Sequence, residues 1–229
     1  KAREIAAWMK ERRGDATILA SSLRLGQFLA SPQDPGLRAD TLAYFQALQR
    51  AYDYALVALF DAQGRLLLTT STNVLSQYSC VASHVGMAQL RTGILVTDLH
   101  RGGPAEPIHL SFLTPIRGPG QTNGPANGVV LLLVDPQRFL FPFLRHWPTP
   151  SPSGETVLLR REGADVVYLN ETRHRPGTAL NLRLPAVELG LPATPTGPGE
   201  AGRFNGRDYR QIPVTAAVQA VPDTPWLVE

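Results

Sequence analysis

Two stretches of this chain share one order of predicted elements: a strand pair, a connector, and three further strands. The first strand pair surrounds the turn Asp61–Gly64, and the second surrounds Arg161–Asp165. Because strands joined by tight turns pair antiparallel, each stretch is expected to form its own antiparallel sheet. The expected strands are 54–61, 65–70, 94–99, 107–116 and 128–135 in the first stretch. In the second they are 156–160, 166–169, 202–204, 209–214 followed directly by 215–221, and 226–228.

A long helix is predicted ahead of the two stretches, over the first thirty residues. Its core-type positions recur at alternating steps of four and three residues, which is typical of a buried helix face or a coiled-coil seam. We therefore consider two interpretations: a weak parallel homodimer through this helix, or packing of the stripe within the chain. A second helix is expected at 37–52, after a Ser/Pro/Gly break at 31–36. The stripe consists of Ile5, Met9, Arg12, Ala16, Leu19 and Leu23.

The pattern predicts an α+β fold with a long N-terminal helix and two tandem PAS-like domains, each with a five-stranded antiparallel sheet. The chain holds 20 Gly and 20 Pro among 229 residues, which favours many turns and excludes an all-helical bundle. A Pro-rich linker at 147–153 separates the domains. We place the domains at 1–36 (helix), 37–146 (ligand-binding) and 147–229 (second PAS-like domain).

Several function classes are disfavoured. The net charge is only +3 and the basic residues are scattered, so we expect no nucleic-acid partner. A single cysteine, Cys80, excludes an internal disulfide, and we interpret it as a small buried filler. The sequence contains no phosphate loop, no His-Glu-x-x-His helix and no Gly-x-Ser-x-Gly elbow, so we expect no catalytic residues, no enzyme activity and no cofactor.

Metal binding is the weaker interpretation of the five histidines. Asp98, His100 and His109 converge if the third and fourth strands are neighbours. However, His100 lies at a strand end beside glycines, where exposure to solvent is expected. We therefore interpret these residues as polar groups near a pocket mouth and assign no metal ligands.

A small-ligand site is suggested by the strand at 107–116. His109, Ser111 and Leu113 share one of its faces, and buried polar side chains require hydrogen-bond partners that a ligand supplies. The alternative is that this face is solvated. The connector at 71–91 would cover the face, and its Arg91 suits carboxylate recognition. The candidate ligand-binding residues are Tyr78, His84, Arg91, Asp98, His109 and Ser111.

A resemblance to a known family rests on several short segments in a characteristic order. They are Ile5–Ala16, Tyr54–Gly64, Val96–His100, Leu110–Ile116, Trp147–Pro148, Gly154–Gly163, Asp208–Val214 and Pro225–Trp226. Together they resemble the double Cache (PAS-like) extracytoplasmic sensor domains of bacterial receptors, and the resemblance covers nearly the whole chain.

The resemblance implies a periplasmic sensor domain of an inner-membrane receptor, most often a histidine kinase and sometimes a diguanylate cyclase or chemoreceptor. It implies a transmembrane helix leading into the first helix, a return to the membrane after Glu229, and a small-molecule ligand in the membrane-distal half. Amino-acid-binding members carry an Arg-x-x-Trp-Tyr-like signature, but the connector 71–91 has no tryptophan. The ligand therefore stays open, and the alternative is a protein-interaction or dimerisation module with no small ligand.

Overall fold

The computed structural model describes residues 1–118, 121, 124–147, 151–191 and 202–229. These residues form two compact units. The first-sheet unit is Glu11–Arg138, and the second-sheet unit combines Lys1–Lys10 with Phe139–Glu229. Parts of the predicted loop at 118–127, of the Pro-rich linker and of the connector before residue 202 lie outside the described residues.

The N-terminal segment forms two helices, α1 (Ala2–Ala20) and α2 (Leu23–Ala30), so the prediction of one helix through residue 30 is wrong. The break falls at two serines. The Ser21 hydroxyl donates to the Ile18 carbonyl, and Ser22 adopts extended backbone angles ahead of α2. Serine side chains compete with helical backbone hydrogen bonds in this way, which explains the break. Over the described residues, no helix combines the length and apolar character required to cross a bilayer.

The predicted apolar stripe is buried as far as the break. Its members Ile5, Met9, Arg12, Ala16 and Leu19 are each at most 6% exposed, whereas Leu23 beyond the break is 67% exposed. This burial favours the interpretation that the stripe packs within the chain rather than forming a dimer seam.

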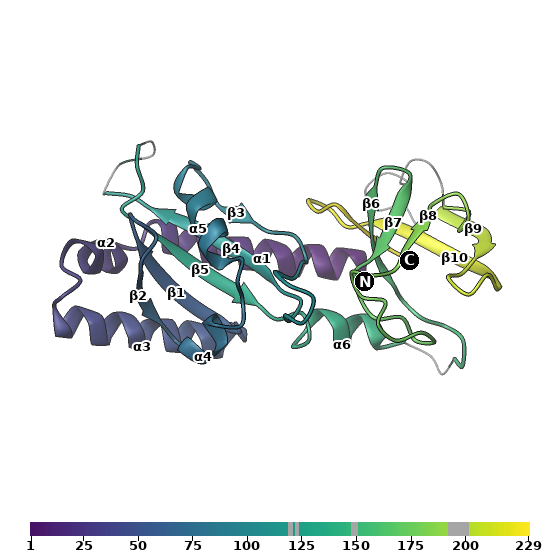
Figure 1. Ribbon diagram of the computed structural model, residues 1–229, viewed down its shortest axis with the longest axis horizontal. Helices are drawn as coiled ribbons and strands as arrows, with labels where there is room; N and C mark the ends of the chain where they lie inside the picture. Colours follow the sequence, from purple (N-terminus) through teal and green to yellow (C-terminus); the bar gives the residue numbers. More distant parts are fainter. Residues whose placement is uncertain (119–120, 122–123, 148–150, 192–201) are drawn as a thin grey trace. The chain divides into compact units, whose positions relative to one another are not determined.

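The first sheet has the strand order β2-β1-β5-β4-β3 and is antiparallel throughout. Helices α4 and α5 lie over one face, and α3 packs against β1 and β2 (Figure 1). The register aligns Ala58, Leu131 and Leu113 across three strands beneath α5. The elements are α3 (Pro35–Tyr52), β1 (Leu56–Asp61), β2 (Leu66–Thr69), α4 (Thr72–Leu75), α5 (Val81–Gln89), β3 (Leu95–Val96), β4 (Leu110–Ile116) and β5 (Gly128–Val134).

The second sheet repeats this order as β7-β6-β11-β10-β9, with an additional strand, β8, beside β7. The prediction of five strands for this sheet is therefore too low by one, because the described residues form six strands. The three-residue β8 lies in a Gly- and Pro-rich connector whose composition gives no strand pattern. The α+β fold and the repeated plan are confirmed. The elements are α6 (Leu140–Arg145), β6 (Leu158–Glu162), β7 (Asp165–Tyr168), β8 (Arg183–Pro185), β9 (Gly202–Arg207), β10 (Pro213–Ala220) and β11 (Trp226–Val228).

One hairpin turn lies later in the chain than predicted. The sequence Asn205–Asp208 suggests a turn, but β9 runs through it to Arg207 and the chain reverses at 208–212. The reason is the Asp208 carboxylate, which accepts hydrogen bonds from the backbone N–H groups of Arg210 (2.7 Å) and Ile212 (3.1 Å). A carboxylate that bonds the backbone two residues on is a strong turn former.

Gly128→Ala is expected to lower the free energy of unfolding by about 1–3 kcal/mol, the usual cost of overpacking. A Cβ at Gly128 would stand 2.5 Å from the Phe60 carbonyl oxygen and 2.7 Å from Leu29 Cδ2, where β1 and β5 pair. Chemical denaturation measures the change. The control is Gly86→Ala in α5, which has open space and is expected to gain about 0.5–1 kcal/mol; equal losses in both variants would contradict the steric account.

Candidate functional site

Buried polar side chains interrupt the apolar face of the first sheet that α4 and α5 cover. Leu113 packs there in the core with Val85 of α5, and the two-residue period of β4 places Ser111 and His109 on the same face. Both are 0% exposed. The Ser111 hydroxyl has no hydrogen-bond partner among the described residues. Leaving a buried hydroxyl unpaired costs about 1–3 kcal/mol, so this face is unlike ordinary core.

Next to this face lies a group of four side chains, here named the Cys–His cluster: Cys80, His84, His100 and His109. The Cys80 Sγ lies 3.4 Å from His100 Nε2 and 3.3 Å from His109 Nε2. Ligating atoms of Cys80, His84 and His100 all lie within 4.8 Å of one another. The His100 ring centroid is 4.9 Å from that of His84 and 4.2 Å from that of His109.

Local structure brings the four residues together in two pairs. Cys80 is the N-cap residue of α5 and His84 follows four positions later, so both project from the same helix face. The Cys80 side chain makes no capping hydrogen bond. His100 and His109 face each other in an isolated antiparallel bridge, in which each backbone N–H donates to the other residue's carbonyl. Cys80 and His84 from the helix therefore meet His100 and His109 from the bridge at the Cys80 thiol.

The backbone fixes the tautomers of two of these imidazoles. His100 Nδ1 lies 2.7 Å from the Asp98 carbonyl oxygen, and His109 Nδ1 lies 3.2 Å from that of Pro107. A carbonyl can only accept, so each Nδ1 carries the hydrogen and donates it. In the neutral ring, each Nε2 therefore presents its lone pair to the Cys80 sulfur.

Burial favours the uncharged forms of Cys80, His84 and His109. It lowers the pKa of His109 to about 4, with a further contribution from His100, and it also lowers the pKa of His84. Burial raises the pKa of the Cys80 thiol. Neutral imidazoles and a nearby thiol are the forms from which metal coordination or hydrogen bonding to a ligand begins.

Most of the predicted site residues gather here. The Tyr78 ring centroid lies 4.5 Å from that of His109, and Tyr78 is buried in the same core. His84 belongs to the Cys–His cluster, and Ser111 shares the face of His109. Asp98 orients the cluster through its backbone carbonyl, while its carboxylate accepts from the Leu99 backbone N–H.

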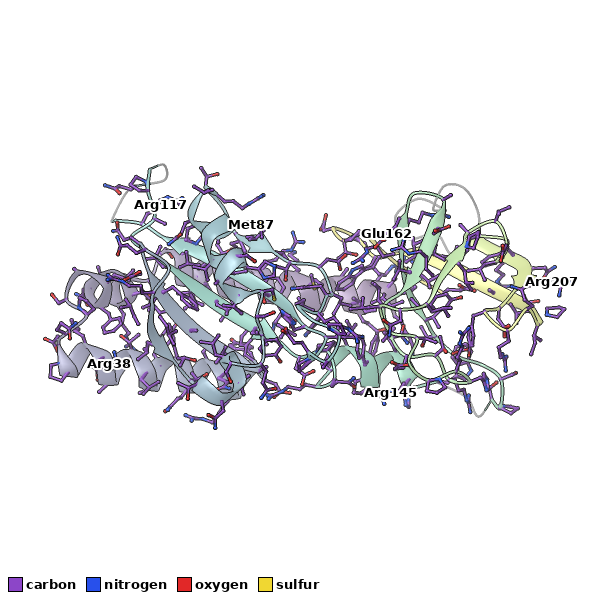
Figure 2. The ribbon with its side chains drawn as sticks, viewed as in Figure 1. Arg38, Met87, Arg117, Arg145, Glu162 and Arg207 are labelled. Carbon is purple, nitrogen blue, oxygen red and sulfur yellow. The ribbon has the colours of Figure 1, made fainter. Side chains whose placement is uncertain are left out.

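Arg91 is the predicted site residue that lies elsewhere. It is exposed, and its carbonyl accepts a hydrogen bond from the guanidinium of Arg117, which follows the last residue of β4 (Figure 2). His109 precedes the first residue of that strand. Eight residues of extended chain span roughly 26 Å, so Arg91 and the Cys–His cluster stand at opposite ends of β4.

Sequence reasoning missed two members of the cluster. Cys80 is half-buried beside three imidazoles, so its interpretation as a small buried filler is wrong. His100 is also partly buried rather than fully exposed. The available signal was the four-residue spacing from Cys80 to His84 in the connector, combined with His100 and His109 at the ends of two predicted strands.

Two cavities elsewhere offer other candidate sites. One of about 850 Å³ lies in the first-sheet unit on the opposite sheet face, lined by the α1–α2 break and by Thr114, whose buried hydroxyl also has no partner among the described residues. The other, of about 720 Å³, lies in the second-sheet unit beside Arg173. The Arg173 guanidinium already donates to the carbonyls of Ser151 and Gly154, each at 2.8 Å.

No protein-family model matches the sequence, and no curated protein matches it. Several solved structures do share its fold. The sensor domain of the V. cholerae histidine kinase DctB has a TM-score of 0.60 at 12% identity, covering 98% of this chain and 89% of that chain. The ligand-binding domain of Pseudomonas aeruginosa PAO1 chemoreceptor PctB, in complex with L-Arg, has a TM-score of 0.58 at 13% identity, covering 99% and 88%.

A further similar structure is the ligand-binding domain of the Pseudomonas fluorescens chemoreceptor CtaA in complex with L-serine. Its TM-score is 0.54 at 16% identity, with 98% of this chain and 88% of that chain covered. These similarities extend over both sheets and agree with the resemblance carried by the sequence segments. The chain therefore has the fold of the double Cache sensor domains.

Proposed function

We propose that this chain is the periplasmic sensor domain of a bacterial inner-membrane receptor. In this proposal the receptor is a histidine kinase, and the alternatives are a diguanylate cyclase or a chemoreceptor. In this proposal transmembrane helices flank the chain in the parent protein, and the chain itself is not catalytic. A small ligand binds in the first-sheet unit and alters the packing of the N-terminal helix. The ligand-bound chemoreceptor domains of similar fold support a binding role.

The observation that carries the proposal is the unpaired, fully buried Ser111 hydroxyl beside the Cys–His cluster. Structural cores seldom retain such groups, because burying them without a partner is destabilising. A ligand between β4 and α5 would supply the missing partner. The site consists of Ser111, His109 and His84 with Tyr78, and Asp98 acts through its backbone.

A matched pair of variants on β4 tests the location. Ser111→Ala and Thr114→Ala each delete one buried, unpaired hydroxyl, but on opposite faces of the sheet. A thermal-shift screen of small acids and metabolites supplies the readout, since a ligand at 100 times its dissociation constant adds about 2.7 kcal/mol to stability. We expect Ser111→Ala to lose the shift and Thr114→Ala to retain it.

The same variants separate binding from folding. Without ligand, Ser111→Ala is expected to be at least as stable as the parent protein, because it removes an unsatisfied buried group. Loss of the ligand shift in Thr114→Ala alone would move the site to the cavity on the opposite face. A screen without any stabilising compound would favour a protein-interaction or dimerisation module.

A further inference from the structure

We propose that the Cys–His cluster is a transition-metal site that binds one Zn²⁺ ion through Cys80, His84, His100 and His109. This inference deepens the proposed function, since it names the chemical class of ligand that the first-sheet unit would sense. It rests on the arrangement of the four side chains, and the metal-binding test below is independent of any signalling readout.

The Cys80 sulfur already stands at nearly the separations that zinc requires from two of the three imidazole nitrogens. With Zn–S near 2.3 Å and Zn–N near 2.0–2.1 Å, tetrahedral geometry places sulfur and nitrogen ligands about 3.5 Å apart. The observed distances from Cys80 Sγ are 3.3 Å to His109 Nε2 and 3.4 Å to His100 Nε2. These two distances therefore need adjustments of only a few tenths of an ångström. The ligating atoms of Cys80, His84 and His100 lie within 4.8 Å of one another, so His84 must move closer, and His109, which lies outside that group of three, must turn toward it to complete four ligands.

The hydrogen-bond count of the cluster leaves room for a cation. Two Nε2 lone pairs face one sulfur, and a thiol has a single hydrogen to donate. At any moment, therefore, only one of these two lone pairs can accept the thiol hydrogen, and the other faces the sulfur without a hydrogen bond. His84 Nδ1 is also buried without a hydrogen-bond partner among the described residues. A metal ion bound to the thiolate would satisfy these acceptors together.

The surroundings have the features of an outer coordination shell. Imidazole ligands usually donate their second N–H to a carbonyl or carboxylate, as His100 does to Asp98 and His109 does to Pro107. The Glu106 carboxylate accepts from the backbone N–H of Ser79, the residue before Cys80, at 3.2 Å. Hydrogen bonding from Ser79, first from its side chain and then from its backbone, lowers the pKa of Glu106, so an anion stands close by to offset the net positive charge of a zinc–thiolate centre.

The donor types select the class of metal. Thiolate and imidazole are ligands for Zn²⁺, Cu⁺ and related ions, whereas Mg²⁺ and Ca²⁺ prefer all-oxygen sites. A tetrahedral set of one sulfur and three nitrogens suits Zn²⁺. Binding displaces the thiol proton, so the measured affinity includes the deprotonation of Cys80.

The test is a Zn²⁺ titration of reduced, chelator-treated protein, followed by calorimetry and by metal analysis after gel filtration. We expect one Zn²⁺ per chain and no binding of Mg²⁺ or Ca²⁺. Cys80→Ser and His100→Ala are each expected to weaken binding by at least about 100-fold, since even outer-shell changes cost 10- to 100-fold. The matched control is His174→Ala, an exposed histidine of the second-sheet unit, which should bind zinc as the parent does.

Cobalt(II) gives a second readout that is independent of affinity. The parent protein with Co²⁺ should show a sulfur-to-metal charge-transfer band and tetrahedral visible bands, and Cys80→Ser should lose the charge-transfer band while its metal-free circular dichroism stays unchanged. Zinc binding that survives Cys80→Ser, or that His174→Ala abolishes, would overturn the inference. If zinc fails but an organic ligand gives a thermal shift that depends on Ser111, the metal inference falls and the proposed sensor function stands.

Discussion

Asp15→Ala is expected to lower the free energy of unfolding by about 3–5 kcal/mol, the cost of leaving a buried charge without its partner. Arg12 is 6% exposed and lies 3.5 Å from the Asp15 carboxylate. The same carboxylate accepts a 2.6 Å hydrogen bond from the Tyr54 hydroxyl, and the Arg12 guanidinium donates to the Tyr52 carbonyl at 2.9 Å. Removing Asp15 therefore leaves the Tyr54 hydroxyl without its acceptor, and among the described residues it leaves Arg12 with only the exposed Glu11 carboxylate, at 3.7 Å, as an ionic partner.

A double-mutant cycle measures this coupling by chemical denaturation. Arg12→Met combined with Asp15→Ala should cost much less than the sum of the two single changes, because no uncompensated charge remains. Additive losses would mean that the two side chains do not act as a pair. The cycle also tests whether Arg12 belongs to the intramolecular core, since a dimer-seam role would make the loss depend on protein concentration.

Trp226→Ala is expected to destabilise the second-sheet unit by about 3–5 kcal/mol, as for other large aromatic deletions in cores. Trp226 is 2% exposed in β11, between β6 and β10. The control is Trp147→Ala, where the tryptophan is 39% exposed and the expected loss is about 1 kcal/mol or less. Thermal unfolding followed by tryptophan fluorescence and circular dichroism distinguishes the variants. Equal losses would place the core of this unit elsewhere.

Much of the fold was predictable because it depends on local signals. The turn at Asp61–Gly64 ends β1 with Gly64 at φ 76°, a conformation that glycine adopts without strain. The turn at Arg161–Asp165 has Gly163 at φ 66° in the same way. These two hairpins, together with the alternating apolar runs, define the repeated strand order in both units.

The errors in the fold prediction have two causes: local hydrogen bonds of serine and aspartate side chains, and strand pairing that outweighs local pattern. The break at Ser21 interrupts a periodicity that on its own favours one continuous helix. β8 has only three residues and is held by pairing to β7, so its own composition does not reveal it. Asn205 resembles a turn residue, but it pairs with Thr215 inside the sheet.

The candidate site was predictable in part. The two-residue alternation along β4 correctly placed His109 and Ser111 on one face, beneath the connector that carries Tyr78 and His84. The role of Cys80 was not predictable from composition. Its small neighbours suggest core, and only the bridge between two strands brings His100 and His109 to its sulfur.

Hydrogen–deuterium exchange of the whole chain, with and without saturating Zn²⁺, tests the central claim most directly. If zinc does not bind, the organic compound with the largest thermal shift replaces it. The account predicts ligand-induced protection in residues 71–91 and 95–111, which carry α4, α5, the His100–His109 bridge and the start of β4. Protection confined to residues 17–30 and 114–118, or to residues 151–173 of the second-sheet unit, would contradict it.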